Sequence, residues 1–469
     1  MDWRLPQMER KSLPGFPAWW VWLLLPLACV LAAAVVLFFT WPVARGFADR
    51  RFWFWLLLIP LLTSVALELF LLSHVLHQRR EIRWRHLFID SKQAQWRQWG
   101  RQSLTLAAWH VLTPEPDLAL RVLGLEGVVP QAPAKAVLLP RPPQSELGMS
   151  PLRDILRQTL TPLLAVLRPQ PVVDIWLYTG SVEDESRQAL AQCWLALLSR
   201  QLPDNRIHWQ AEPPDARLLY QWCDEASDTP RLLLCTQLLS ADAAGSEFSV
   251  ALLFTAARQR LPENTGFRPV SVFRPLFAPA TEPEEALTDL LAVEQMVKGQ
   301  RRHLWDAGLD TRARNTVLAV LDAQGETLPS DGQHLLARHI GEPDKNSFWL
   351  ALGLAAQATD TGQRGQMVVA PLPEQTACVQ LNVHPAPATQ WPEDSISRYP
   401  LAWTAGVCCV LLLFFLLMDS TVQQTLWPWL AGGGVLYALL MLAAVPLALI
   451  LWQRRLNDEW QLQGGIRHE

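Results

Sequence analysis

The residue types that most often carry catalysis are scattered along this chain of 469 residues. Its seven cysteines form no Cys-x-x-Cys pair and no cluster with histidine, so their spacing predicts neither a metal site nor a redox pair. We expect them to be buried apolar residues in a reducing compartment. His334 and His339 are five residues apart, about 140° around a helix, so they do not share a face. They are predicted to be surface or capping residues.

Motifs that bind phosphate or activate a nucleophile do not occur in the sequence. There is no Gly-x-x-x-x-Gly-Lys-Ser/Thr loop, no Gly-x-Gly-x-x-Gly after a strand pattern, no Gly-x-Ser-x-Gly and no His-Glu-x-x-His. The formal net charge of −4 provides no basic field that would hold nucleic acid. The sequence therefore predicts no cofactor, no metal and no nucleic-acid partner.

The stretch 289–305 combines acidic and basic residues with a tryptophan. It is predicted to form a helix, and its simplest interpretation is a solvated face. The alternative is a docking surface for a protein partner formed by Arg301, Arg302 and Trp305, because Arg and Trp are the most frequent hot-spot residues of interfaces.

Half of the residues are apolar and only 18% are charged, which excludes a disordered chain and an ordinary soluble enzyme. Four apolar runs are each close to the ~20 residues that a helix needs to cross a bilayer. They predict two transmembrane hairpins, one near each end of the sequence, with four helices at 18–40, 53–76, 401–418 and 428–452. Glu68 and His74 are ionisable residues of the second run, but one buried carboxylate in four helices favours an anchor over a transport pathway.

Tryptophan and arginine flank these apolar runs. Both residue types concentrate at the headgroup level of a membrane. Because cytoplasmic flanks are enriched in Lys and Arg, the arginines after the second and fourth runs predict that both termini and the middle of the chain are cytoplasmic. The predicted membrane-interface residues are Trp19, Trp20, Trp41, Trp53, Arg79, Arg80, Arg83, Arg85, Trp427, Trp429, Trp452, Arg454 and Arg455.

Composition divides the chain into four predicted parts. Residues 1–76 hold the first hairpin, and 77–150 hold a basic, Trp-rich juxtamembrane segment and a Pro-rich connector. An α/β domain occupies 151–398, and the second hairpin with a short tail occupies 399–469.

In the α/β domain short apolar runs alternate with amphipathic ones. Continuous apolar strands between helices are typical of a layered domain whose sheet is covered on both faces. Strands are predicted at 172–178, 231–236, 248–255, 316–322, 365–370 and 377–383, and helices at 183–202, 213–224, 333–339 and 347–360.

Several segments between about 170 and 385 resemble the thiolase-like fold of condensing enzymes such as the β-ketoacyl synthases. They are the acidic-to-apolar run 245–253, the sequence His-Ile-Gly-Glu at 339–342, the helix pattern 346–360 and the hairpin pattern 365–383. The resemblance implies a thiolase-like layered cytoplasmic domain between the two hairpins.

The chain departs from this family at the catalytic positions. Active members carry a catalytic His after the Ile-Gly pair, where this sequence has Glu342. Their nucleophile is a Cys at a strand-to-helix turn with small neighbours, a setting that none of the four central cysteines has: Cys193, Cys223, Cys235 and Cys378. The sequence thus favours a domain without condensing activity.

Tethered proteins of this kind are similar to bacterial type VI secretion accessory proteins, including lipase-effector adapters. The resemblance implies a non-enzymatic inner-membrane adapter whose partners are the lipid bilayer and a secretion effector or a component of the secretion machinery. Two alternatives stay open. One is a membrane-bound acyl- or lipid-processing enzyme with Glu342 as its acid or base, and the other is an immunity protein against a membrane-acting toxin.

Overall fold

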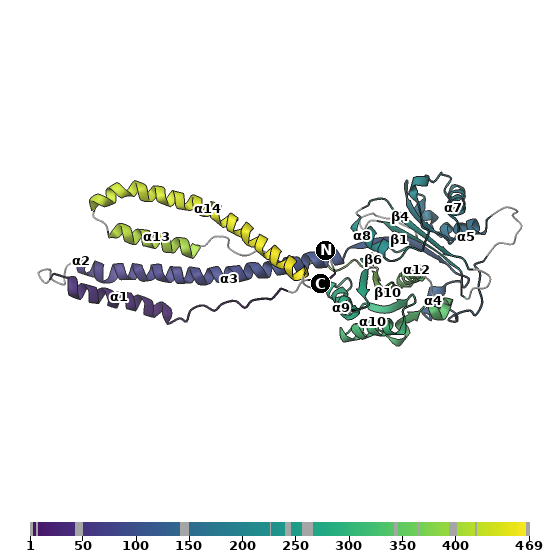
Figure 1. Ribbon diagram of the computed structural model, residues 1–469, viewed down its shortest axis with the longest axis horizontal. Coiled ribbons are helices and arrows are strands. Elements are labelled where there is room, and N and C mark those ends of the chain that lie inside the picture. The colour runs from purple at the N-terminus through teal and green to yellow at the C-terminus, as the bar shows by residue number, and fades with distance from the viewer. Residues whose placement is uncertain are drawn as a thin grey trace. The chain divides into compact units, whose positions relative to one another are not determined.

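A computed structural model (Figure 1) describes residues 3–5, 8–42, 50–140, 150–225, 227–239, 245–255, 266–341, 346–363, 365–393, 401–417 and 420–465. The chain divides into two compact units. Unit 1 comprises Met1–Arg4 and Gln95–Thr389, and unit 2 comprises Leu5–Ala94 and Gln390–Glu469. Most of the segment predicted as the juxtamembrane connector therefore falls in unit 1.

Unit 1 is built on one mixed sheet, which within the described residues has eleven strands. Its strand order is β3-β2-β4-β5-β1-β6-β11-β10-β8-β9, and β7 pairs with β11 beside this path. The strands are β1 Ser103–Leu112, β2 Asp174–Tyr178, β3 Ile207–Trp209, β4 Arg231–Gln237, β5 Phe248–Thr255, β6 Val270–Phe273, β7 Leu276–Pro279, β8 Arg301–Asp306, β9 Gln333–Leu335, β10 Gly365–Leu372 and β11 Gln375–Asn382.

Helices connect these strands. They are α4 Leu118–Val122, α5 Pro151–Leu160, α6 Leu164–Leu167, α7 Glu183–Leu198, α8 Arg217–Asp224, α9 Pro283–Val293, α10 Thr311–Ala323, α11 Ala337–Ile340 and α12 Ser347–Asp360. Single 3-10 turns lie at Thr161–Leu163, Asp204–Arg206 and Ser330–Gly332.

The sheet consists of two halves with the same pairing pattern. In the first half β3, β2 and β4 are parallel, β5 is antiparallel to β4, and β1 is antiparallel to β5. In the second half β9, β8 and β10 are parallel, β11 is antiparallel to β10, and β6 is antiparallel to β11. The halves join where β1 pairs antiparallel with β6. Unit 1 is thus a topological duplication, and α8 and α12 occupy equivalent places in its two halves.

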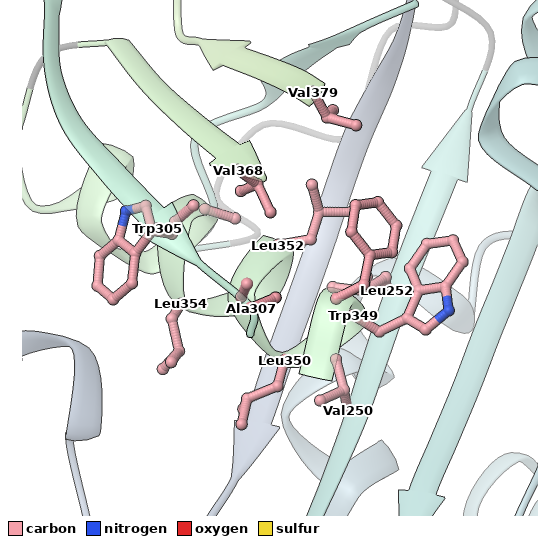
Figure 2. Packing of buried hydrophobic residues seen from close by; sticks show 14 of the residues in the cluster. Val250, Leu252, Trp305, Ala307, Trp349, Leu350, Leu352, Leu354, Val368 and Val379 are labelled. Atoms are coloured by element: carbon pink, nitrogen blue, oxygen red, sulfur yellow. The ribbon is translucent and has the colours of Figure 1, made fainter. Parts of the chain in front are cut away.

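Both faces of the sheet are covered, which explains why its strands are continuously apolar. Along β5, Val250, Leu252 and Phe254 belong to the core that contains α12, whereas Ala251 and Leu253 belong to the core that contains α5 and α7. Helix α12 is apolar on all sides and is enclosed by strands (Figure 2), as expected for a helix without a solvated face.

The predicted α/β class is confirmed as a mixed α/β sheet. The strands predicted at 172–178, 231–236, 248–255, 365–370 and 377–383 correspond to β2, β4, β5, β10 and β11. The helices predicted at 183–202, 213–224 and 347–360 correspond to α7, α8 and α12.

Three predicted elements are wrong. Residues 316–322 lie in α10 and not in a strand, because Asp310 caps this helix by accepting a hydrogen bond from the Ala313 amide. The predicted helix 333–339 is divided between β9 and α11. The predicted helix 289–305 ends at Val293, and its last residues begin β8.

Unit 2 contains helices α1 Val21–Thr40, α2 Arg50–Trp53, a π-helical turn Phe54–Leu58, most of α3 Ile59–Gly100, α13 Leu401–Leu416 and α14 Ser420–Gly465. Among the described residues three helical segments are long and apolar enough to cross a membrane, namely Val21–Thr40, Arg50–Gly100 and Gly432–Gln463. Helix α13 is apolar but has 16 residues. The predicted count of four spans therefore stays a prediction.

Candidate functional site

The segments that carry the family resemblance meet at one place in unit 1. The Ser246 amide donates to the Ile340 carbonyl at 2.9 Å, and the Val137 amide donates to the Gly245 carbonyl at 2.9 Å. Gly341 has φ +97°, and a Cβ on it would lie 2.7 Å from the Gly245 Cα. Only glycine fits this close approach of two backbones. These residues, 137–139, 245–247 and 339–341, are termed the junction.

Glu247 is the carboxylate of the junction and is completely buried. Its Oε2 accepts a hydrogen bond from the Leu139 amide at 2.9 Å, and its Oε1 accepts one from the Leu239 amide at 3.2 Å. The side chain therefore fixes two backbone segments around the start of β5.

Glu342, the candidate acid or base, lies outside the described residues. The described residue that follows the gap is the buried Asn346, whose Oδ1 accepts a hydrogen bond from the Cys235 thiol at 3.2 Å. This contact places the Cys235 thiol against an amide oxygen.

Trp349 fills the space beside the start of α12. Its ring is fully buried, and its Nε1 donates to the Pro214 carbonyl at 2.5 Å. Pro214 lies in the turn 210–216 that leads from β3 into α8, which is the strand-to-helix turn in contact with the first turn of α12. Figure 2 shows the Trp349 ring packed among the core side chains of β5 and α12.

None of the four central cysteines lies on a strand-to-helix turn. Cys193 is within α7, Cys223 near the end of α8, Cys235 in β4 and Cys378 in β11. Burial raises the pKa of Cys193 to about 11 and the pKa of Cys378 to about 12. Desolvation also raises the pKa of Cys223 to about 12, although Arg274 opposes it. Because the thiolate is the nucleophile, these three thiols are poorly suited to attack a carbonyl.

Two histidines that are distant in sequence pair at the edge of the sheet. His303 Nε2 donates to Gln363 Oε1 at 3.1 Å, so His303 Nδ1 accepts from His334 Nε2 at 3.0 Å. The His334 ring also lies 4.5 Å from the Trp305 ring. The prediction that His334 is a surface or capping residue is wrong, because it lies on β9 and is 3% exposed.

Unit 1 is expected to lose stability as the pH falls from about 6.5 to 4. Desolvation lowers the pKa of His334 to about 4, and it also lowers the pKa of His303. Above pH 6.5 His334 is neutral in both the folded and the unfolded chain. Between pH 6.5 and 4 the unfolded chain binds a proton at His334 that the folded chain does not. This difference in proton binding lowers the free energy of unfolding by about 3 kcal/mol across that pH range.

The measurement is the pH profile of thermal unfolding of the full chain, followed by tryptophan fluorescence. His334→Gln keeps a donor for His303 and should flatten the profile between pH 6.5 and 4. His384→Gln, at an exposed position, should leave the profile unchanged. A profile for His334→Gln that matches wild type would contradict the assignment.

The proposed docking residues do not form one surface. Arg301 and Trp305 are buried on β8, and only Arg302 of the three is exposed. Arg301 forms an ion pair with Glu326 at 2.8 Å, and the Trp305 indole donates to Gln366 Oε1 at 2.8 Å. The prediction of a helical surface is wrong because these tertiary partners bury the charged start of a strand.

The Arg301–Glu326 pair lines a cavity of about 470 Å³ beneath α9. Lys298 and Glu294 add one charge of each sign, and Met296 and Val297 add apolar wall. The charges of this cavity balance, so its chemistry selects neither anions nor cations. Among the described residues no cluster of three or more His, Cys, Asp or Glu side chains is arranged to hold a metal ion.

The predicted membrane-interface residues lie in unit 2. Trp19, Trp20, Trp53, Trp429, Arg83, Arg454 and Arg455 are exposed, and Trp41 packs edge-on against Phe52. Arg79 donates to the Pro14 carbonyl at 2.7 Å, and Arg85 forms a two-pronged ion pair with Glu459. The Trp452 ring lies beside the Trp84 ring, and the Arg80 guanidinium lies beside His77. The Trp427 side chain is outside the described part of the chain.

A comparison with protein-family models finds no match, and a comparison with curated protein sequences finds none. Solved structures with similarity are ketosynthases and related proteins. A type II polyketide synthase ketosynthase in complex with its acyl-carrier protein has a TM-score of 0.40 at 10% identity, covering 61% of this chain and 100% of that one. A Streptomyces albus oxazolomycin ketosynthase domain has a TM-score of 0.38 at 11% identity, covering 63% and 100%. The 3-oxoacyl-[acyl-carrier-protein] synthase III of Aquifex aeolicus has a TM-score of 0.34 at 11% identity, covering 60% and 99%.

Proposed function

We propose that this protein is a non-enzymatic adapter of the bacterial inner membrane. Unit 2 is the anchor, and unit 1 is a thiolase-like body that presents a surface to a cytoplasmic protein partner. The observation that carries the proposal is the buried Trp349, bonded to the Pro214 carbonyl.

A nucleophile must lie within hydrogen-bond reach of its base. In the family that the sequence resembles, the base follows the Ile-Gly pair, which is Ile340-Gly341 in this chain. The strand-to-helix turn in contact with the start of α12 is 210–216, and it contains no cysteine. A tryptophan occupies the adjoining space, and the sequence supplies Glu342 where the base would be. These features support a body that has kept the architecture of a condensing enzyme and lost its chemistry.

The membrane part of the proposal is supported by the three long apolar helical segments and by the arginines that flank them. We place both termini and unit 1 on the cytoplasmic side, with the predicted Trp and Arg residues at the two interfaces. Tethering a body to a membrane raises its effective concentration for a partner at the same surface, so weak contacts suffice. The partner that the family resemblance implies is an effector or a component of bacterial type VI secretion.

The test of the catalytic part is exposure of the full-length protein, in detergent, to acyl-thioesters followed by intact-mass measurement. We expect no acyl adduct, because burial raises the pKa of the Cys193 and Cys378 thiols to about 11 and 12. Alkylation of the unfolded chain controls for detection of its thiols, and an active ketosynthase controls for the reagent. An adduct on any cysteine of the folded chain would instead favour an acyl-processing enzyme.

The adapter and topology parts are tested in the native host. A fluorescent protein fused to the C-terminus should fluoresce, and an alkaline phosphatase fused there should be inactive, because we place that end in the cytoplasm. Cross-linking in intact cells should recover a secreted effector or a secretion component, and its absence would contradict the adapter role. Protection against a membrane-acting toxin that is lost on deletion of 401–452 would favour the immunity alternative.

A further inference from the structure

Two adjoining cavities lie between α3 and α14 within unit 2. One, of about 190 Å³, is lined by His77, Arg80 and Glu81 of α3 opposite Val445 and Ala448 of α14. The other has about 370 Å³. Because both are lined by Trp84, Leu449 and Trp452, they form one continuous hollow, termed the α3–α14 groove.

The groove lies where both helices change from apolar to charged. In α14 the apolar segment that contains Val445, Ala448 and Leu449 ends at Trp452, and Arg454 and Arg455 follow. In α3 the apolar segment ends at Leu76, and His77 begins a basic stretch. In a chain anchored as proposed above, this change marks the interface between hydrocarbon and headgroups. The molecule that surrounds the groove at that depth is a phospholipid.

The polar side of the groove carries one arginine and one carboxylate, within a stretch of α3 that is basic. Arg80 lines it, next to His77, whose Nδ1 lies 3.3 Å from the guanidinium. Glu81 is the carboxylate of the same wall, and its Oε1 lies 4.0 Å from His77 Nε2. Arg79 and Arg83 lie on neighbouring turns of α3, so arginine exceeds carboxylate on this stretch. Such a surface attracts the phosphate of an anionic headgroup.

The Trp84 indole adds a hydrogen-bond donor to the wall of the groove. Its Nε1 is shielded from solvent and has no hydrogen-bond partner among the described residues. The ring itself is held edge-on against Trp452, with centroids 6.3 Å apart. A buried donor without an acceptor is costly, and an ester or phosphate oxygen of a lipid in the groove would remove that cost.

The helices that form the groove are clamped beside it, which keeps it preformed. Arg85 bonds to both carboxylate oxygens of Glu459, at 3.1 and 2.5 Å. Ile89 and Leu456 are buried together one turn further along. A preformed concave site with apolar walls and few polar groups is the usual geometry for a small ligand.

We propose that the α3–α14 groove binds one anionic phospholipid of the bilayer. Its acyl chain lies along Leu449, Ala448 and Val445, and its headgroup phosphate is bound by Arg80 and the Trp84 indole. The proposal rests on the membrane anchor proposed above.

The experiment is native mass spectrometry of the full-length protein in detergent, titrated with palmitoyl-oleoyl phosphatidylglycerol or with the matching phosphatidylcholine. Wild type should retain one phosphatidylglycerol about fivefold more tightly than phosphatidylcholine, the effect of one basic residue at an anionic surface. Leu449→Trp fills the groove and should abolish retention of both lipids. Arg80→Gln should reduce phosphatidylglycerol retention to the level of phosphatidylcholine.

The controls change the same residue types outside the groove. Leu436→Trp alters an exposed position of α14, and Arg312→Gln removes an exposed charge from α10 of unit 1; both should bind as wild type does. Equal retention of the two lipids by wild type, or equal behaviour of Leu449→Trp and Leu436→Trp, would overturn the proposal. Competition by free glycerol phosphate would overturn it too, because it would identify a soluble anion as the ligand.

A separate measurement distinguishes failure of the groove from failure of the anchor. Membranes that contain wild type or Leu449→Trp are washed with alkaline carbonate, and both proteins should stay in the membrane. A wild type that washes off would contradict the anchor. A Leu449→Trp chain that stays embedded and still retains phosphatidylglycerol would contradict the groove alone.

Discussion

Replacing Arg274 with alanine is expected to lower the free energy of unfolding of unit 1 by about 3–5 kcal/mol. The guanidinium is completely buried between the rings of Trp99 and Tyr220, at 4.4 and 4.8 Å from their centroids. Its Nε donates to the Trp99 carbonyl at 3.2 Å, and a terminal nitrogen donates to Asp224 Oδ1 at 2.6 Å and to the Gln102 side chain. Alanine would remove these bonds and leave a cavity between two rings.

The bond to Trp99 matters because α3 ends there, inside unit 1. The last carbonyl groups of a helix have no partner within the helix. Arg274 caps the carbonyl of Trp99, and the Gln295 side chain caps that of Gly100 at 2.7 Å. The Trp99 carbonyl also accepts a hydrogen bond from the Gln102 amide at 3.2 Å, so Arg274→Ala would remove one of its two donors.

The unfolding of the full chain in detergent, followed by tryptophan fluorescence, measures this effect. Arg274→Met keeps most of the volume and should lose less stability than Arg274→Ala. Arg312→Ala, at an exposed position of α10, should change the unfolding free energy by less than about 0.5 kcal/mol. If Arg274→Met is as stable as wild type, the polar bonds of Arg274 contribute no net stability and the explanation given above is wrong.

The elements predicted correctly from the sequence are those whose pattern depends only on burial. β4 and β5 are buried on both faces, so the runs Leu232–Leu234 and Val250–Phe254 are apolar without interruption. The pattern of α12 is apolar over the length of a helix, so the predicted bounds, 347–360, agree with those of the structure.

The elements that were missed depend on partners far away in the sequence. β8 begins with the residues Arg-Arg-His, a polar pattern that does not predict a buried strand. In the structure Arg301 is buried in an ion pair with Glu326, and His303 is hydrogen-bonded to His334. β1 joins the two halves of the sheet, but its apolar run lies within 77–150, where the sequence predicts only a basic juxtamembrane segment and a connector. No local pattern separates these strands from a helix, because the groups that neutralise or cover them arrive only on folding.

The candidate site shows the same division. The sequence alone identified the Ile-Gly-Glu departure at 340–342, and the structure brings Gly341 against Gly245. The sequence could not identify Trp349 as the residue that fills the space beside the start of α12, because a tryptophan is not unusual in an apolar helix. That role follows from the contact with Pro214, 135 residues away.

Trp349→Ala is expected to lower the free energy of unfolding by about 3–5 kcal/mol without creating any acyl-transfer activity. The ring is fully buried, so alanine would leave a cavity beside the start of α12, and the Pro214 carbonyl would lose its donor. The cavity would still lack a nucleophile, because the turn 210–216 contains no cysteine and the Cys235 thiol faces the Asn346 amide oxygen.

Unfolding followed by tryptophan fluorescence measures the loss of stability, and the intact mass after exposure to acyl-thioesters shows whether any residue has been acylated. Trp349→Phe, which loses only the donor and part of the ring, should fall between alanine and wild type, and Trp391→Ala, at a half-exposed tryptophan, controls for the loss of one fluorophore. A Trp349→Ala chain that is as stable as wild type would show that neither the burial of the ring nor its bond to Pro214 contributes stability. One that becomes acylated would show that the tryptophan alone had blocked a working enzyme.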